Sequence, residues 1–443
     1  MLLIRNGRII DPAQGIDGIF HILIKEGKIK EIISVKQEMP DSKIKSSNPC
    51  LNDNQLIDAR GLIVAPGLID IHAHLREPGY EYKENIKTGC AAAAAGGFTT
   101  IFCMANTDPV NDNPTVTDFI LKKAGKVGCV NVFPVGAVTR GLRGETLTDM
   151  GKLKKAGVIA VSDDGMPLKS IRIARLALEL ARKFDLTIIS HCEGPIIKED
   201  GPIDEGSVSA GLNLKRVSPA TEETMVAREI SLAELTGGSF HIAHVSTAES
   251  VKLLRAAKSR GVNITAETAP HYFTLTDEAV KKYGTNAKVN PPLRTKADRE
   301  AVREGLRDGT IDVIATDHAP HSESDKDREF FLAENGMVGL ETAIPLSLKL
   351  YHDGLLSLIE LIKKLTINPA RIFKLNKGTL DVGSDADLTI IDPEAKVVIN
   401  KQDFRSRGKN TPFDRWRLKG RVIMTIVDGK VIFSEKVAGS LNG

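Results

Sequence analysis

Short apolar runs alternate with helical patterns from Leu62 to about Phe373. The apolar runs end at polar or turn residues, which is typical of buried strands, while residues 170–184 and 220–235 have helical spacing. Strand followed by helix, repeated over about 300 residues, predicts a parallel sheet and most economically a (β/α)8 barrel of the α/β class. The runs that carry this prediction are Thr99–Met104, Val130–Val135, Val158–Val161, Thr187–Ser190, Phe240–Val245 and Val313–Thr316.

The two ends of the chain carry strand-like runs without long helices between them. Examples are Phe20–Ile24 near the start and Arg421–Val427 near the end. We expect these ends to build one small β-sandwich beside the barrel, with the polar stretch Lys36–Asn54 as a loop. The predicted division is residues 1–61 for the N-terminal part of the sandwich, 62–375 for the catalytic barrel and 376–443 for the C-terminal part.

The composition limits the possible partners. Among 443 residues, 42% are hydrophobic and 26% charged, and the net charge is +3, so there is no electrostatic case for binding nucleic acid or a membrane surface. No apolar run reaches about 18 residues, and the N-terminus turns polar too early for a signal peptide. The cysteines are odd in number and scattered without a Cys-x-x-Cys spacing, which favours a reducing cytoplasm. They are Cys50, Cys90, Cys103, Cys129 and Cys192.

A His-x-His pair ends the first apolar run of the predicted barrel. Side chains alternate along a strand, so His72 and His74 point the same way and could grip one metal ion. If the strand continues, Arg76 adds a planar cationic group on the same face. The pair alone is only moderately specific for metal.

Further ligand-type residues follow later apolar runs, at the places where strands of a barrel end. Each has an ordinary alternative: Asp164 as a turn residue, His191 and His244 as buried core histidines, and Asp317 as a cap. Their coincidence at one barrel mouth favours a metal site, because imidazole and carboxylate suit Zn²⁺ and one carboxylate can bridge two ions. Asp163 remains an alternative to Asp164. The set is His72, His74, Asp164, His191, His244 and Asp317.

The ordered motifs resemble those of the amidohydrolase superfamily, and closely those of bacterial class I dihydroorotases. The strongest are Asp70–Gly79, DIHAHLREPG, and Ala315–His321, ATDHAPH. The resemblance covers essentially the whole chain. Supporting stretches are Met104–Thr107, Ser162–Gly165, His191–Glu193, His244–Ser246, Asn290–Arg294, Gly339–Thr342 and Asp381–Leu388.

The resemblance implies a role for each matching residue. His72, His74 and Asp317 would bind the more buried of two zinc ions in each subunit, and His191 and His244 the second. Asp164 would bridge them or contribute to the second site, in place of the carboxylated lysine of many superfamily members. Arg76, Asn106 and His321 would hold the substrate carboxylate, and Asn290 would contact the ring. The full set of implied substrate residues is His74, Arg76, Asn106, Asn290, His321, Asn335 and Gly336.

The implied reaction is the reversible cyclisation of N-carbamoyl-L-aspartate to L-dihydroorotate plus water, the third step of de novo pyrimidine biosynthesis. Asp317 would pass the proton of the attacking hydroxide to the leaving amide nitrogen. The charged loop from His318 to Val338 is a candidate lid. Ala333–Gly336 departs from the Ala-Pro-Phe-Gly common in the family. Substrate contacts there would be through backbone groups, so they could survive the difference.

Two alternatives stay open. One is another cyclic amidase, a hydantoinase or an allantoinase; Arg76 and the missing bridging lysine argue against it. The other is an inactive scaffold for aspartate transcarbamoylase, which would be expected to have lost metal ligands. The resemblance also implies a homo-oligomer and a possible complex of the active enzyme with that transcarbamoylase. The remaining histidines, among them His241 three positions before His244, are predicted to be structural.

Overall fold

A barrel of parallel strands forms the larger part of the molecule. The computed structural model describes residues 1–35, 56–194 and 201–435, so the expected loop at Lys36–Asn54 lies outside the described residues. Eight parallel strands follow one another in chain order around the barrel, which confirms the α/β barrel prediction. They are β6 (Leu68–Ala73), β7 (Phe98–Cys103), β8 (Asn131–Gly136), β9 (Ala160–Val161), β10 (Ile188–Ser190), β13 (Phe240–Ile242), β14 (Ile264–Thr268) and β15 (Val313–Ile314).

Polar contacts span the seam between the last and the first barrel strands. The Thr316 amide donates to Asp70 Oδ1 at 2.9 Å, and its hydroxyl donates to Oδ2 at 2.6 Å. An isolated parallel bridge joins Ala73 to His318. The seam therefore brings the two polar segments that follow β6 and β15 together at one end of the barrel.

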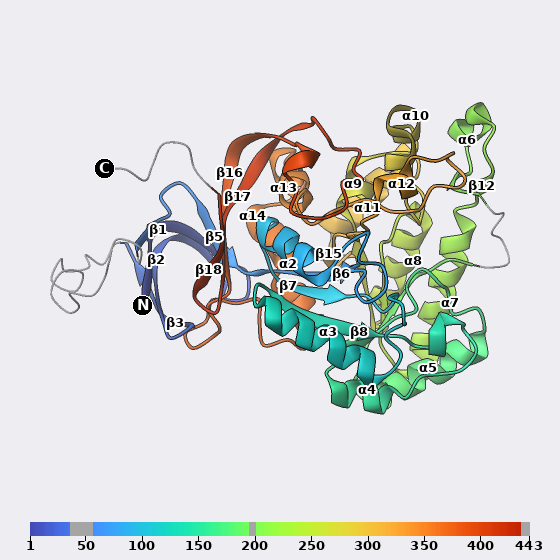
Figure 1. Cartoon of the computed structure of the whole chain (residues 1–443), viewed down its shortest axis with the longest axis horizontal. Coiled ribbons are helices and arrows are strands. Elements are labelled where there is room, and N and C mark those ends of the chain that lie inside the picture. The colour runs from blue at the N-terminus through green and yellow to red at the C-terminus, as the bar shows by residue number, and fades with distance from the viewer. Residues whose placement is uncertain (36–55, 195–200, 436–443) are drawn as a thin grey trace.

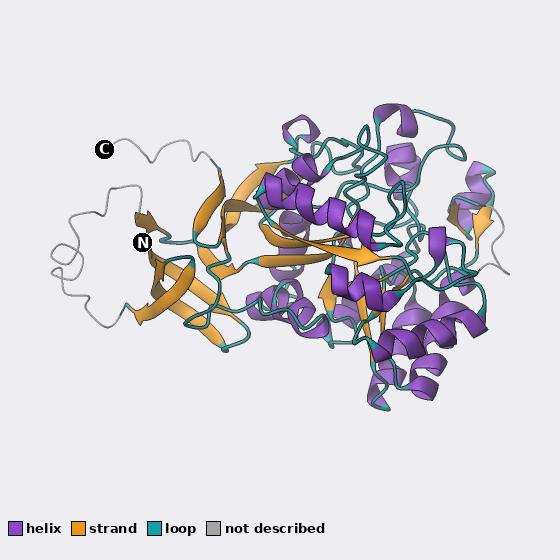
Figure 2. Cartoon of the chain, turned by 60° about the horizontal axis from the view of Figure 1, so that its bottom comes forward, coloured by secondary structure: helices purple, strands orange, loops and turns teal. Residues whose placement is uncertain are grey.

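Helices surround the barrel and pack on the outward residues of its strands (Figure 2). The two helices predicted at 170–184 and 220–235 are present as α5 and α7. Several begin at side-chain caps, such as Asn85, whose Oδ1 accepts the amide of Thr88 at 2.9 Å at the start of α2. The longer helices are α2 (Ile86–Ala95), α3 (Pro114–Val127), α4 (Met150–Ala156), α5 (Ile171–Lys183), α7 (Ala220–Thr236), α8 (Ala248–Ser259), α11 (Lys296–Arg307), α13 (Ala343–His352) and α14 (Leu358–Leu365).

Shorter elements lie in the connections. They are α6 (Ser207–Leu212), α9 (Pro270–Thr274), α10 (Ala279–Tyr283), α12 (Glu323–Lys326), α15 (Ile367–Ile372), the paired strands β11 (Ile203–Asp204) and β12 (Arg216–Val217), and 3₁₀ turns at Arg140–Leu142, Gly284–Ala287 and Lys401–Asp403. None of the helices in the described ranges is both long enough and apolar enough to cross a membrane.

The two ends of the chain form a second sheet, on the left of Figure 1. Its order is β18-β17-β16-β5-β1-β2-β3, with β4 on β1, so both ends of the chain contribute strands to one small β-structure beside the barrel, as expected. Both halves enclose one apolar core, to which Ile22 of β2 and Ile426 of β17 belong. The strands are β1 (Leu2–Asp11), β2 (Ile16–Lys25), β3 (Lys28–Ser34), β4 (Leu56–Asp58), β5 (Ile63–Pro66), β16 (Leu388–Val398), β17 (Arg417–Val427) and β18 (Lys430–Ser434).

Strand β5 joins the halves contributed by the two ends of the chain. It pairs in parallel with β1 and antiparallel with β16. Its residues Ile63–Pro66 therefore connect the terminal sheet to the start of the barrel. Two residues later the chain enters the first barrel strand.

Candidate active site

A cavity of about 420 Å³ lies at the carboxyl ends of the barrel strands. It contains all the residues predicted to bind substrate and all the predicted metal ligands except His72, which is fully buried beside it. The predicted residues that line it are His74, Arg76, Asn106, Asp164, His191, His244, Asn290, Asp317, His321, Asn335 and Gly336.

The predicted metal ligands lie at or just beyond the carboxyl ends of the barrel strands. His72 is the penultimate residue of β6, and His191 comes directly after β10. His244 and Asp317 follow β13 and β15 and have positive φ angles of 37° and 47°. These backbone conformations are uncommon for residues other than glycine, and they end the regular side-chain alternation of the strands.

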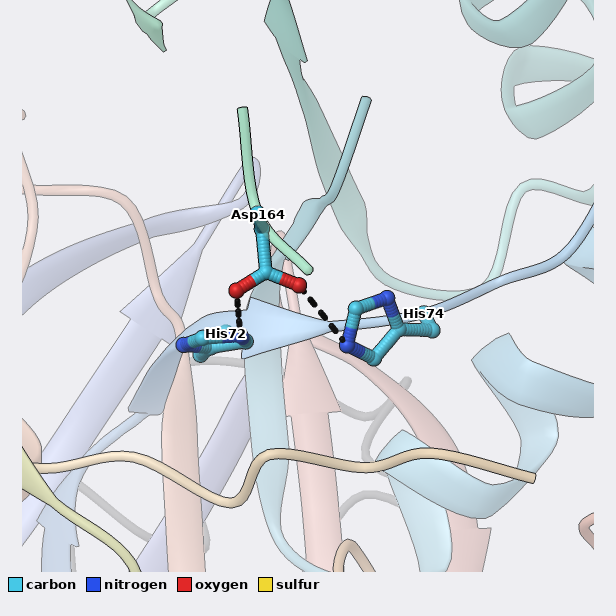
Figure 3. Close-up of side chains that lie close together, drawn as sticks. All are labelled: His72, His74 and Asp164. Carbon is cyan, nitrogen blue, oxygen red and sulfur yellow. Dashed lines mark ion pairs between the residues drawn. The ribbon is translucent and has the colours of Figure 1, made fainter. Parts of the chain in front are cut away.

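Asp164 lies between the two histidines of the His-x-His pair (Figure 3). Its Oδ1 is 3.3 Å from Nε2 of His72, and its Oδ2 is 3.5 Å from Nε2 of His74. The three donor atoms lie within 4.8 Å of one another and all three residues are buried. This arrangement forms the first group that could hold a metal ion.

The same aspartate belongs to a second group with His191 and His244. Nδ1 of His191 and Nε2 of His244 are 2.8 Å apart, and each lies 3.7 Å from Asp164 Oδ1. Two imidazole nitrogens that face each other and a carboxylate can converge on one cation. Asp164 is therefore common to both groups.

Asp163, the alternative left open by the sequence, points elsewhere. Its carboxylate accepts the amides of Val138 and Thr139 at 2.8 and 3.0 Å and also the Thr139 hydroxyl. Burial opposes ionisation of Asp164, but the imidazoles of His72, His244 and His74 hold its pKa well below the usual range. The carboxylate that faces the histidines is therefore charged at neutral pH.

The residues present fit a metal ion. Nε2 of His72 is buried and has no hydrogen-bond partner among the described residues, although it faces two carboxylates. A buried polar atom without a partner is costly, and a cation beside it would remove that cost. Imidazole with carboxylate is also a donor set that zinc and related divalent ions accept.

Asp317 lies at the edge of the first group. Its Oδ1 is 3.4 Å from Nε2 of His74 and 3.7 Å from Nε2 of His72. Burial alone would raise its pKa, but the contact with His74 and the nearby rings of His72 and His244 lower it to about 2. The carboxylate is thus ionised at neutral pH and can accept a proton.

The cavity also has a cationic side. One guanidinium nitrogen of Arg76 lies 3.3 Å from His321 Nε2, and Lys83 Nζ lies 3.3 Å from His321 Nδ1. Burial and then the charges of Arg76 and Lys83 hold the pKa of His321 well below its usual range, so this ring is neutral. Arg76 and Lys83 give the cavity a place for a carboxylate.

The two asparagines contact the histidine groups. Asn106 Oδ1 lies 2.9 Å from Nδ1 of His74, and its Nδ2 lies 3.5 Å from Asp164 Oδ2. Asn290 Nδ2 lies 3.3 Å from Nε2 of His191. Both amides therefore lie between the histidine groups and the open cavity.

The segment before Gly339 supplies backbone groups to the cavity. The Asn335 carbonyl lies 2.8 Å from His321 Nε2, and the Gly336 amide donates to the Lys288 carbonyl at 2.9 Å. Gly336 has a φ of +133°, and a Cβ there would lie 2.6 Å from the Cβ of Ala319. Only glycine fits this backbone, which keeps the segment close to His321.

Some residues of the site gave no signal in the sequence. Lys83, Tyr80, Tyr82 and Glu334 line the cavity but stand in mixed polar stretches of ordinary surface composition. Glu267, behind His72, alternates with apolar neighbours as in any half-exposed strand. Its position becomes evident only when the barrel closes.

The architecture and the cluster together define a class. A histidine–aspartate cluster at the mouth of a (β/α)8 barrel is an arrangement suited to metal-assisted hydrolysis, and residues 227–432 match the family described as "Amidohydrolase family". L-hydantoinase (dihydropyrimidinase) from Arthrobacter aurescens has a similar structure, with a TM-score of 0.85, 27% identity, and coverage of 97% of this chain and 95% of that one. Dihydropyrimidinase from Brevibacillus agri shares the fold with a TM-score of 0.81 at 22% identity, covering 98% and 95% of the two chains.

The sequence comparisons are more specific. Residues 61–250 match the family described as "Dihydro-orotase-like". The dihydroorotase of Syntrophus aciditrophicus is 52% identical over 98% of this chain and 99% of its own length, and that of Geobacter metallireducens is 51% identical with the same coverage. This chain belongs to the dihydroorotase family.

Proposed function

We propose that this chain catalyses the reversible cyclisation of N-carbamoyl-L-aspartate to L-dihydroorotate with release of water, the third step of de novo pyrimidine biosynthesis. The observation that carries the proposal is a single cavity with a histidine–aspartate cluster on one side and Arg76 with His321 on the other. Such a cavity suits a cyclic amide that bears a carboxylate. The dihydroorotases at about 50% identity over nearly the whole chain support the same substrate.

The cofactor in this proposal is zinc, two ions in each subunit. His72, His74 and Asp317 would hold one ion, His191 and His244 the other, and Asp164 would bridge them. Bound zinc supplies a Lewis acid that makes water nucleophilic at neutral pH and polarises the amide carbonyl.

The other steps belong to residues of the chain. Arg76, Asn106 and His321 hold the substrate carboxylate, Asn290 contacts the ring, and Asn335 and Gly336 contribute backbone groups. His74, a metal ligand, also borders the substrate. In hydrolysis, Asp317 accepts the proton from the attacking water at its carboxylate and then donates it to the departing amide nitrogen. In ring closure, the carbamoyl nitrogen attacks the side-chain carboxyl carbon, and the same carboxylate takes the proton from that nitrogen and passes it to the oxygen that departs as water.

The first experiment is hydrolysis of L-dihydroorotate by the purified chain with zinc, followed by ultraviolet absorbance. We expect turnover that disappears with a chelator and returns with zinc. A panel with hydantoin and allantoin tests the nearer alternative, which the structural likeness to L-hydantoinase keeps relevant. Faster turnover of a ring without a carboxylate would overturn the dihydroorotate proposal.

Asp317→Asn tests the proton transfer. The amide retains the shape of the carboxylate but cannot take up a proton, so we expect kcat to fall by about 10²–10⁴-fold. Zinc content, measured by elemental analysis, should stay largely intact, and Asp381→Asn, at an exposed position, serves as the matched control. Turnover near the original rate would exclude Asp317 as the proton carrier.

Further proposals concern organisation. We propose residues 1–61 and 376–443 as the terminal β-rich part and 62–375 as the catalytic barrel, with β5 as the strand that connects them. We also propose a cytoplasmic homo-oligomer, able to associate with aspartate transcarbamoylase. Co-purification of the two chains, with dihydroorotate turnover measured before and after mixing, tests that association.

A further inference from the structure

A buried carboxylate lies directly behind the first metal group. Oε1 of Glu267, on β14, is 2.5 Å from Nδ1 of His72, the ring nitrogen that points away from Asp164. Both side chains are at most 1% exposed. Glu267 does not line the cavity, so it cannot touch substrate there.

The second oxygen of Glu267 has its own partner. Its Oε2 is 3.2 Å from Nε2 of His241, and Nδ1 of His241 is 2.8 Å from the hydroxyl of Thr265. His241 is fully buried, and its ring packs at 5.5 Å on Phe373. A line of contacts therefore runs from Thr265 through His241 and Glu267 to His72.

The hydrogen-bond partners of His72 and His241 determine which ring nitrogens carry a hydrogen. A carboxylate only accepts hydrogen bonds, so Nδ1 of His72 carries a hydrogen toward Glu267, and Nε2 is the nitrogen left to bind a metal ion once it has lost its own proton. That is the nitrogen that lies 3.3 Å from Asp164 and has no hydrogen-bond partner. In the same way, the Thr265 hydroxyl can donate to Nδ1 of His241 while Nε2–H of His241 donates to Glu267.

The other three histidines lack an equally close carboxylate. His74 Nδ1 faces the neutral amide of Asn106, and His191 Nε2 is 3.5 Å from Glu193. Nδ1 of His244 has no hydrogen-bond partner among the residues that the structure describes. A carboxylate behind a ligating imidazole raises its basicity and fixes its orientation.

We propose that Glu267, oriented by His241, is a positioning residue that strengthens metal binding at His72 by fixing the tautomer and direction of that ring. The inference rests on the metal site of the proposed function. It assigns a role to two buried side chains that neither touch the cavity nor bind the ion. It also gives His241 a place in the site, whereas its sequence context predicts a purely structural residue.

The test measures zinc affinity of the full chain rather than turnover. Zinc is titrated into metal-free protein against a chromogenic chelator for the wild type, Glu267→Gln, Glu267→Asp and His241→Gln. We expect Glu267→Gln to weaken binding of one zinc equivalent by about 10–100-fold. His241→Gln should act in the same direction by less, and Glu267→Asp should restore part of the affinity.

Two further measurements separate positioning from stability. The visible spectrum of the cobalt-substituted protein reports the ligand field, which Glu267→Gln should change and a distant destabilising substitution should not. Asp11→Asn is the matched control, because Asp11 is a fully buried carboxylate in the terminal sheet that holds Gln14 and the Leu380 amide. Thermal unfolding of the metal-free variants measures how much each substitution destabilises the fold, so that this loss can be compared with the loss of zinc affinity.

The outcomes are distinct. Zinc affinity within twofold of wild type in Glu267→Gln, or an equal loss in Asp11→Asn, overturns the proposal. If Glu267→Gln does not fold, unchanged affinity and an unchanged cobalt spectrum in His241→Gln overturn it instead. Intact zinc binding with no turnover of dihydroorotate counts against the proposed function and leaves this inference standing.

Discussion

Three residues of the cavity hold strained backbone conformations. Arg76, His244 and Asp317 have φ angles of 59°, 37° and 47°. A residue in such a conformation destabilises the fold by of order 1–3 kcal/mol, and the conformation persists only where neighbouring contacts enforce it. Hydrogen bonds do so here: the Tyr80 amide donates to the Arg76 carbonyl at 2.9 Å and the Val245 amide to the Glu267 carbonyl at 2.8 Å. The site is therefore preorganised by backbone contacts as well as by side chains.

If the proposed zinc ions bind here, titration of the histidines couples their binding to pH. Burial disfavours charge on His72, but Asp164 and Glu267 raise its pKa well above 6.5, and Glu193 and Asp164 likewise raise that of His191. In metal-free protein, these charged pairs stabilise the fold below pH 6.5, and that contribution is lost as pH rises through the raised pKa values. Zinc needs neutral imidazole, so its binding strengthens over the same range.

We therefore expect zinc to raise the melting temperature more at pH 8 than at pH 6. Each proton released on binding adds up to about 1.4 kcal/mol per pH unit to the binding free energy. Melting curves with and without a fixed zinc concentration measure the difference, and magnesium, which prefers oxygen ligands, serves as the control. An equal or smaller gain at pH 8 would contradict this coupling.

At the scale of elements, two buried lysines hold the irregular segment 330–336 beside the cavity. Lys326 Nζ, at the end of α12, donates to the carbonyls of Glu334 and Gly336 at 2.7 and 3.0 Å. Lys288 Nζ donates to the carbonyls of Phe331, at 2.9 Å, and Ala333. These bonds replace the regular pairing that a strand or helix would provide.

Lys326→Met should loosen this segment. Burial and the nearby Lys288 lower the pKa of Lys326 to about 7, so its amine is only partly charged at neutral pH. Losing its hydrogen bonds to the segment costs about 1–3 kcal/mol, so we expect roughly a tenfold rise in KM for dihydroorotate and faster proteolysis near residue 331. Lys281→Met, which removes a half-exposed lysine from α10, is the control. Unchanged KM together with unchanged proteolysis would show that the segment holds its position without Lys326.

Part of the site could be predicted from the sequence and part could not. His72 and His74 could be predicted because two histidines at alternate strand positions end an apolar run, and Asp317 because it follows one. Glu267 could not, because a polar residue alternating with Ile264 and Ala266 also fits a strand with one face in water. Its partner His72 is 195 residues away, and only closure of the barrel turns that face inward.

At the scale of the whole molecule, buried polar contacts fasten the terminal sheet to the barrel. The Asp387 carboxylate accepts hydrogen bonds from Lys377 Nζ at 2.7 Å, Asn131 Nδ2 of β8 at 3.1 Å and the Asp428 amide at 2.9 Å. The Thr425 hydroxyl of β17 donates to the Ala94 carbonyl of α2 at 2.7 Å. The barrel and the sheet should therefore unfold together.

Asp387→Ala tests this fastening. It removes one acceptor from each of three donors, although Lys377 retains Asp385 and Asn131 retains the Thr99 carbonyl. We therefore expect a loss of about 1–3 kcal/mol and a lower melting temperature that still shows one calorimetric transition. Asp381→Ala, at an exposed position of the same connection, should change little. Two separate transitions, with the barrel melting at its original temperature, would contradict joint unfolding.

The pairing of β5 with β16 has a consequence for biosynthesis. Leu388–Ile391 pairs with Ile63–Pro66, about 325 residues earlier in the chain. At roughly 5–20 residues per second, a ribosome needs on the order of 15–65 s to deliver the partner strand. Throughout that time β5 presents an apolar, unpaired edge, the kind of surface at which chains aggregate. We therefore expect this edge of β5 to need protection from other chains until β16 has been synthesised.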